Sequence, residues 1–125
     1  MRFMITLSLL LNMVVLAPVC AGLITDAGWA RASYGAATAA RGILLSVYLA
    51  IGLVSALFLV FREPKLIAAL LLVQVAYKLT TPLTVGTLHN PVVVSNLGIA
   101  SFHAVTLLLI WRAGQEMHPW LIPRP

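Results

Sequence analysis

Two long stretches without a charged side chain constrain this sequence more than any other feature. They cover residues 3–25 and 42–61, and a helix needs about 20 mostly apolar residues to cross a bilayer. The whole chain is 62% hydrophobic and 9% charged, with a mean hydropathy of +1.04. This composition excludes a water-soluble domain. We therefore expect an integral membrane protein.

The second half of the chain is divided by helix-breaking residues. Residues 79–111 carry no charge but are too many for one span. The segment His89-Asn90-Pro91 combines a turn-forming Asn with a Pro suited to the first turn of a helix. The sequence thus predicts one all-α domain, a four-helix membrane bundle whose third span is kinked near Pro82. The expected spans are about 3–24, 42–61, 64–87 and 91–112, with an outer segment at 25–41 and a tail at 113–125.

The N-terminal run has an alternative interpretation as a cleaved secretory signal. Val19-Cys20-Ala21 before Gly22 is similar to a small-residue cleavage site that would remove residues 1–21. The run is longer than a usual signal core, however, and Asn12 lies in its middle. We expect the span to be retained.

The distribution of Lys and Arg predicts the orientation. Cytoplasmic loops of membrane proteins carry an excess of these residues. With the N-terminus inside, five of them are cytoplasmic and three lie on the far side, so we expect both termini in the cytoplasm, in a multi-pass protein of a bacterial inner membrane. The five are Arg2, Arg62, Lys65, Arg112 and Arg124, and the three are Arg31, Arg41 and Lys78.

Small residues recur every four positions along the second span. Gly42, Ser46 and Ala50 form a stripe that a neighbouring backbone can approach closely. Packing inside the bundle is the simpler interpretation, and contact with another protein is the alternative.

Polar residues within the spans are the candidates for function, because each costs free energy in hydrocarbon unless it has a partner. Gln74, Lys78 and Thr81 share one helix face, and Asn96 and His103 share another. With Asn12 and Tyr48 from the first two spans, they predict an outward-opening polar cavity. The candidate ligand-binding residues are Lys78, His103, Gln74, Asn96, Asn12 and Tyr48.

Each candidate also has a purely structural alternative. Asn12 and Gln74 are suited to interhelical hydrogen bonds, and either could satisfy His103. The long stem of Lys78 can extend to the headgroups, or its ammonium can pair with Asp26, the one acid expected on that side.

Several function classes are disfavoured by what the spans lack. No Asp or Glu lies within them, and small proton-coupled drug exporters need such a carboxylate. His89 and His103 are about 21 Å apart along one helix, which argues against a haem held within the chain. A single Cys and four scattered Met give no metal site, and no catalytic motif of a hydrolase occurs. No basic cluster suited to nucleic acid is present.

The segment Ala40-Arg41-Gly42, leading into an apolar span with three further spans in the chain, resembles the small four-helix DoxX-like membrane proteins. The resemblance covers most of the chain at the level of architecture. It implies a membrane-embedded protein, in some cases a subunit of a quinone-linked oxidoreductase, and it transfers no catalytic residue.

Short loops leave no room for a soluble active site, so an enzyme is the less expected outcome. We expect an accessory subunit that packs against other integral membrane proteins, or against a second copy, and stabilises a larger complex. The alternative is a binding protein or enzyme subunit that holds a quinone, lipid or other anionic amphiphile in the polar cavity. A channel or transporter is a third possibility.

Overall fold

The computed structural model describes residues 1–117, with side chains placed for residues 1–114. This part of the chain is helical and contains no strand. Four of its helices are long and apolar enough to cross a membrane. The prediction of an all-α, four-helix membrane fold is confirmed. The helices are α1 (Arg2–Thr25), α2 (Gly28–Tyr34), α3 (Ala39–Val60), α4 (Pro64–Val85) and α5 (Pro91–Met117).

Local sequence signals set several helix ends. The Thr38 hydroxyl accepts the backbone N–H of Arg41 and caps α3. Gly86 ends α4 in the left-handed conformation at φ 84°, which a glycine adopts without strain. Asn90 then caps α5, because its Oδ1 accepts the N–H of Val92 at 2.9 Å. The predicted break before residue 91 therefore lies where α5 begins.

The helix bounds differ from expectation at two places. α3 begins at Ala39, three residues before the predicted start. α5 continues to Met117, so the first part of the segment predicted as a tail is helical. The rest of that tail, with His118, Trp120 and Arg124, lies outside the described residues.

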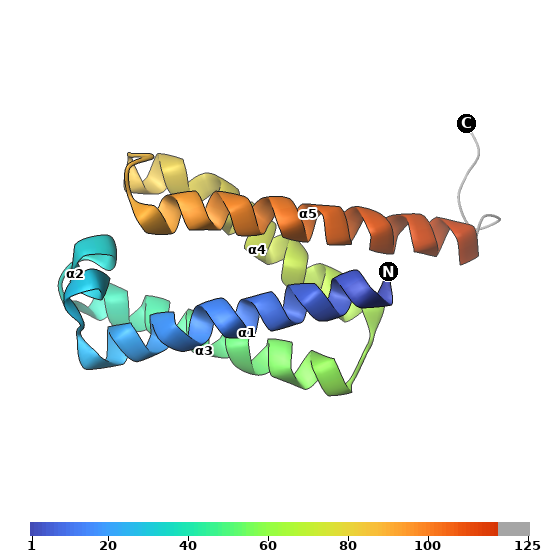
Figure 1. Cartoon of the computed structure of the whole chain (residues 1–125), viewed down its shortest axis with the longest axis horizontal. Helices are drawn as coiled ribbons and strands as arrows, with labels where there is room; N and C mark the ends of the chain where they lie inside the picture. The colour runs from blue at the N-terminus through green and yellow to red at the C-terminus, as the bar shows by residue number, and fades with distance from the viewer. Residues whose placement is uncertain (118–125) are drawn as a thin grey trace.

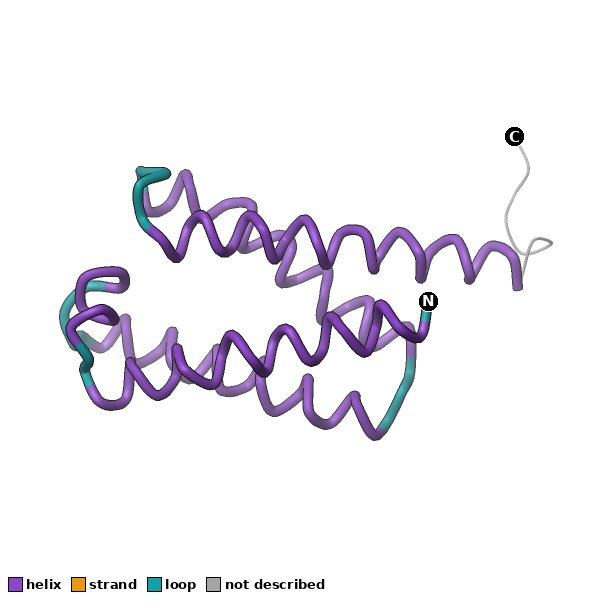
Figure 2. The backbone as a smooth tube through the Cα atoms, viewed as in Figure 1, coloured by secondary structure: helices purple, strands orange, loops and turns teal. Residues whose placement is uncertain are grey.

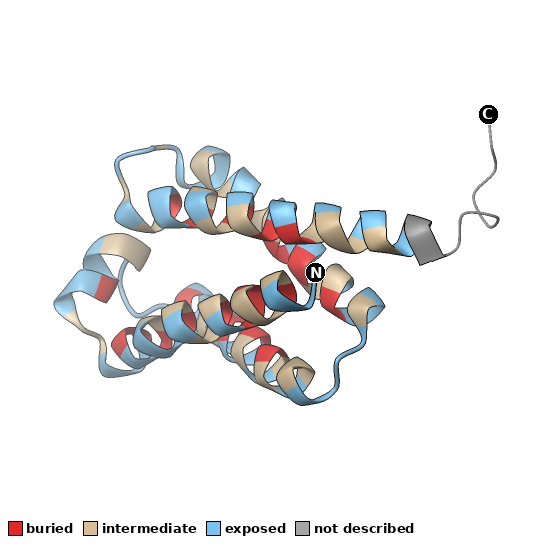
Figure 3. Cartoon of the chain, turned by 45° about the vertical axis from the view of Figure 1, so that its right-hand side comes forward, coloured by how far each residue is buried: buried red, intermediate tan, exposed pale blue. Residues whose placement is uncertain are grey.

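The spans form two antiparallel pairs. α1 packs against α3, and α4 packs against α5 (Figure 1). The tube in Figure 2 shows the loops at the ends of the pairs, with α2 at one end and the start of α1 at the other. These two ends are called the α2 end and the basic end below. Buried residues lie on the inward faces of the spans, and exposed residues cover the outside (Figure 3).

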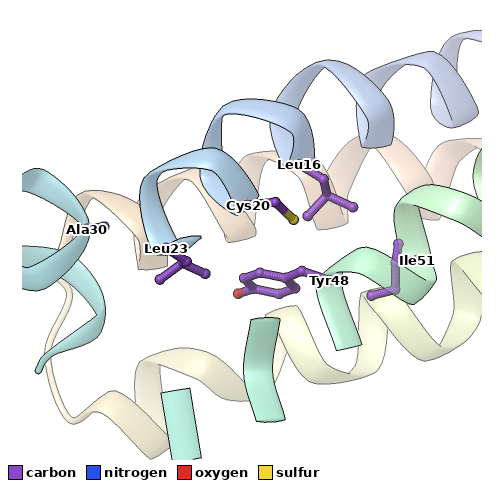
Figure 4. Close-up of a cluster of buried hydrophobic side chains, with 6 residues drawn as sticks. All are labelled: Leu16, Cys20, Leu23, Ala30, Tyr48 and Ile51. Atoms are coloured by element: carbon purple, nitrogen blue, oxygen red, sulfur yellow. The ribbon is translucent and has the colours of Figure 1, made fainter. Parts of the chain in front are cut away.

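Two apolar clusters hold the pairs together. One joins α1, α2 and α3 near the α2 end, where the Tyr48 ring lies among aliphatic side chains and the Cys20 thiol (Figure 4). The other brings Ile5 and Leu9 of α1 against Ile67 and Leu71 of α4. This second cluster links the two pairs toward the basic end.

The outer segment predicted at 25–41 contains α2, which packs back on the bundle. Ala30 is buried, and the Trp29 ring lies against Gly22 so closely that a Cβ there would collide with it. Asn90 Nδ2 donates to the backbone oxygen of Ser33 at 2.8 Å. α2 therefore contacts both pairs at this end.

Asp26 is the centre of an ionic cluster beside α2. The residue has a left-handed conformation at the end of α1, and its carboxylate lies 2.8 Å from Arg41 and 3.4 Å from Arg31. Arg41 also donates to the backbone oxygen of Gly35 at 2.9 Å, and its side chain is 6% exposed. The Arg41 bonds therefore connect the end of α1, the loop after α2 and the start of α3.

The small-residue stripe of α3 does not pack inside the bundle. Gly42, Ser46 and Ala50 are exposed, and a Cβ on Gly42 would meet nothing within 4 Å. The inward face of α3 carries Tyr48 and Ile51 instead. The internal interpretation of the stripe is wrong, because the larger residues of this helix make the contacts with α1.

The two arginines beside Asp26 make a matched pair for mutagenesis. We expect Arg41→Met to lower the free energy of unfolding by about 1–3 kcal/mol, because it breaks two hydrogen bonds at a nearly buried site. Arg31→Met removes an exposed pair, and its effect should stay below about 0.5 kcal/mol. Unfolding in mild detergent, followed by circular dichroism, measures both. Equal effects of the two changes would contradict the structural role of Arg41.

Candidate functional site

The candidate polar side chains of the spans point into the bundle. Tyr48 is buried, and so are the five candidates with amide, ammonium or imidazole groups, while the outer faces of the same helices are mostly apolar. Helical periodicity places them there, since residues three or four apart share a face. Those five are Asn12, Gln74, Lys78, Asn96 and His103.

Asn12 connects three helices at mid-depth. Its Nδ2 donates to Ser55 Oγ of α3 at 3.0 Å, and its Oδ1 lies 2.8 Å from His103 Nε2 of α5. A carbonyl oxygen only accepts, so Nε2 carries the ring hydrogen and Nδ1 is left as an acceptor. About one helical turn away from His103, Ser8 and Thr106 join α1 and α5 through a 2.8 Å hydrogen bond between their hydroxyls. Asn12 is thus an interhelical hydrogen-bonding residue, and ligand contact by it stays a prediction.

Gln74 and His103 carry unused polar atoms in the interior. Both side chains are fully buried at 0% exposure. Within the described residues, Gln74 Oε1, Gln74 Nε2 and His103 Nδ1 have no hydrogen-bond partner. The two residues lie at similar depths, each about 17 Å along its helix from the α4–α5 connection. Unpaired buried polar atoms are costly and rare, so these three atoms have hydrogen-bonding capacity that the described residues do not use.

Lys78 is buried without a carboxylate. The residue is 4% exposed, and its Nζ donates to the Tyr77 hydroxyl at 2.7 Å while lying 4.6 Å from the centre of that ring. No ion pair to Lys78 forms among the described residues. Asp26 pairs with Arg41 and Arg31 instead, so the predicted alternative of a Lys78–Asp26 pair is wrong. The reason is geometric, since Asp26 leaves α1 beside the start of α3.

A cavity of about 130 Å³ lies at the α2 end, bounded by α2, α3, α4 and α5. Two predicted residues, Tyr48 and Asn96, line it. Lys78, Gln74 and His103 are not among its lining residues, and a cavity shared by Lys78 and His103 stays a prediction. Adjacent helical residues project about 100° apart, and on α4 the cavity is lined by Tyr77, Thr81 and Val85.

The cavity wall is mostly apolar and contains three phenols. Tyr34 and Tyr48 meet edge to face with ring centres 6.0 Å apart, and Tyr77 lines the cavity with them. Burial, followed by the neighbouring Tyr48, raises the pKa of the Tyr34 phenol well above its usual range, so this group stays protonated and able to donate. Asn96 Nδ2 donates weakly to Thr81 Oγ1 at 3.4 Å on the same wall.

Sequence reasoning missed Tyr34 and Tyr77 as lining residues. Tyr77 and Thr81 are four apart and share a helix face, which was a usable signal. Tyr34 had no such signal, because only the return of α2 onto the bundle brings it to the cavity.

Comparison of the chain with known proteins found no similar family, sequence or structure. No protein-family model matches the sequence, and neither curated proteins nor solved structures give a match. The resemblance to DoxX-like proteins therefore stays a prediction.

Asn12 is the residue whose loss should separate the helices most. We expect Asn12→Ala to lower the free energy of unfolding by about 1–3 kcal/mol, because Ser55 and His103 both lose a buried partner. Val14→Ala, at a position 70% exposed on the same helix, is the control and should have little effect. Denaturation in mixed detergent micelles compares the two variants. Wild-type stability of Asn12→Ala would show that the three helices do not depend on this residue.

Proposed function

We propose that this protein is a membrane-embedded binding protein or enzyme subunit that holds the polar head of an amphiphile between its two helix pairs. The observation that carries the proposal is the burial of Lys78 without an acidic partner among the described residues. A lysine at the centre of a span costs roughly 2.5–3.5 kcal/mol. A ligand with an anionic or carbonyl oxygen would offset that cost.

The hydrogen bond between Lys78 and Tyr77 links the buried ammonium to the cavity, because Tyr77 lines the cavity and Lys78 does not. The Tyr77 oxygen accepts a hydrogen bond from the ammonium, so its own O–H is free to donate to another group. A donor whose oxygen is already bonded to a cation is polarised and donates more strongly. Tyr77 would thus present part of the Lys78 charge to a ligand oxygen in the cavity.

The size and lining of the cavity favour a small polar head attached to an apolar tail. About 130 Å³ accommodates a head group and not a whole amphiphile. Its mostly apolar wall contains a few phenol and amide groups that can donate to a carbonyl or carboxylate oxygen. A quinone ring, a fatty acid carboxylate or a lipid head meets this description, and the DoxX-like resemblance favours a quinone.

Substitution of Lys78 tests this function directly. We expect Lys78→Met to weaken binding of decylubiquinone or oleate at least tenfold, because the buried cation is lost. Equilibrium dialysis of the full chain in mild detergent gives the dissociation constants. Lys65→Met removes an exposed lysine from the same helix and should bind like the wild type.

Binding by Tyr77→Phe and the outcome for Lys78→Met together test whether the buried lysine and its tyrosine partner hold the ligand. Tyr77→Phe should weaken binding while keeping the ring and the bundle intact. If Lys78→Met folds and binds both probes as tightly as the wild type, the buried lysine has no part in binding and the proposal is wrong.

The accessory-subunit role is a second candidate, and the exposed stripe of α3 supports it. Gly42, Ser46 and Ala50 are exposed and leave room for a close backbone approach. Another membrane helix, from a partner or a second copy, would bury this surface. Such an assembly is compatible with ligand binding, because the stripe faces away from the cavity lining.

Bulky residues on the stripe test for this assembly. We expect the double change Ser46→Leu and Ala50→Leu to abolish co-purifying proteins or self-association, while thermal stability stays within about 0.5 kcal/mol of the wild type. Val47→Leu enlarges an exposed residue of the same helix as a control. Chemical crosslinking in native membranes provides the measurement. Unchanged crosslinking by the double variant would exclude the stripe as an interface.

The placement of the cations supports the proposed orientation. Arg2, Arg62, Lys65 and Arg112 gather at the basic end, whereas Arg31 and Arg41 lie beside Asp26 at the α2 end. An excess of Lys and Arg favours the cytoplasmic side. We accordingly propose a bacterial inner-membrane protein with the α2 end outward and both termini in the cytoplasm.

A further inference from the structure

A second and larger cavity lies at the basic end, remote from the cavity beside α2. Its volume is about 650 Å³, within the range of pockets that hold small ligands. It lies between the start of α1 and the connection from α3 to α4. Its lining residues are Met1, Arg2, Ile5, Arg62, Pro64 and Ile67.

Arg62 is held in place with donors to spare. Its Nη1 donates to Thr6 Oγ1 at 2.8 Å, and its Nε donates to the backbone oxygen of Leu59 at 3.2 Å. A guanidinium has five N–H donors, so three remain unused. The two bonds fix the group over the start of α1 without neutralising it. An arginine that is positioned but uncompensated suits a phosphate or carboxylate.

The surroundings of Arg62 are positive as well. Arg2 lines the same cavity and has no side-chain hydrogen bond or ion pair to the described residues. Glu63 is the one carboxylate of residues 1–114 at this end, and its Oε1 accepts the backbone N–H of Lys65. The starts of α1 and α4 lie at this end together with the ends of α3 and α5, so the dipoles of the four spans largely cancel here. The positive charge of the cavity therefore comes from its two arginines.

The floor of the cavity is apolar. Ile5 and Ile67 are 4% and 0% exposed and belong to the cluster that joins α1 to α4. Cations therefore lie above aliphatic side chains at the end of the spans. A phospholipid in a bilayer has the same order, with its phosphate at the interface and its acyl chains beside the helices.

We propose that this cavity binds the phosphate of an anionic phospholipid between Arg2 and Arg62, with the glycerol and first acyl carbons against Ile5 and Ile67. The binding is independent of the amphiphile site beside Lys78. It would hold α1 to the start of α4 at the basic end, where a single lipid contacts both helix pairs.

Native mass spectrometry of the full chain in mild detergent tests the lipid site. The probes are dioleoyl phosphatidylglycerol and dioleoyl phosphatidylcholine, which share acyl chains and differ in net charge. We expect retention of phosphatidylglycerol in preference to phosphatidylcholine. Arg62→Gln and Arg2→Gln should each lower phosphatidylglycerol affinity about fivefold, since one cation near an anionic headgroup contributes about that much. Arg62→Lys should retain part of the preference.

Arg112→Gln is the matched control, because it removes an equal charge from α5 without touching the cavity lining. Its phosphatidylglycerol affinity should equal that of the wild type. An equal loss in Arg112→Gln would mean diffuse attraction and would overturn the proposal. Inorganic phosphate distinguishes a free anion from a lipid: phosphate that binds as tightly as phosphatidylglycerol, with the same dependence on Arg62, would overturn the lipid assignment.

Discussion

The hydrogen bonds of Asn12 are the interaction on which the arrangement of the two helix pairs depends. Apolar side chains gain little by leaving lipid for another apolar surface, so burial alone specifies helix pairing weakly in a membrane. Asn12 links α1 to Ser55 within its own pair and to His103 across the pairs. The bond between Ser8 and Thr106 repeats the connection between α1 and α5. These contacts fix the depth and rotation of α5 relative to α1.

The two ends of the bundle differ in chemistry because different segments lie there, α2 at one end and the start of α1 with the α3–α4 connection at the other. At the α2 end, the return of α2 and the pairing of Asp26 with Arg41 place phenols and amides around a small cavity. At the basic end, Arg2 and Arg62 line a larger cavity above an apolar floor. The proposed ligands follow this division, with an amphiphile head held by donors at one end and a lipid phosphate held by cations at the other.

Charge compensation separates the structural residues from the candidate binding residues. Arg41 is nearly as buried as Lys78, yet it has a carboxylate and a backbone oxygen as partners. Lys78 has the Tyr77 hydroxyl and ring, which stabilise an ammonium without neutralising it. Gln74 likewise has neither side-chain atom bonded within the described residues. A polar group whose partners are complete holds the fold together, whereas one with unused capacity can accept a ligand.

The four spans, the break before Pro91 and the inward position of the candidate polar residues could be predicted from the amino-acid sequence alone. These properties depend on local composition and helical periodicity, because hydrocarbon forces backbone groups into helices and polar side chains away from lipid. Which side chains become partners depends on how the helices pack against one another. The stripe at Gly42, Ser46 and Ala50 faces outward, Asp26 pairs with Arg41 and not with Lys78, and Tyr34 joins Tyr77 at the cavity. Each of these depends on the rotation of one helix against another, which is set by contacts between residues far apart in the chain.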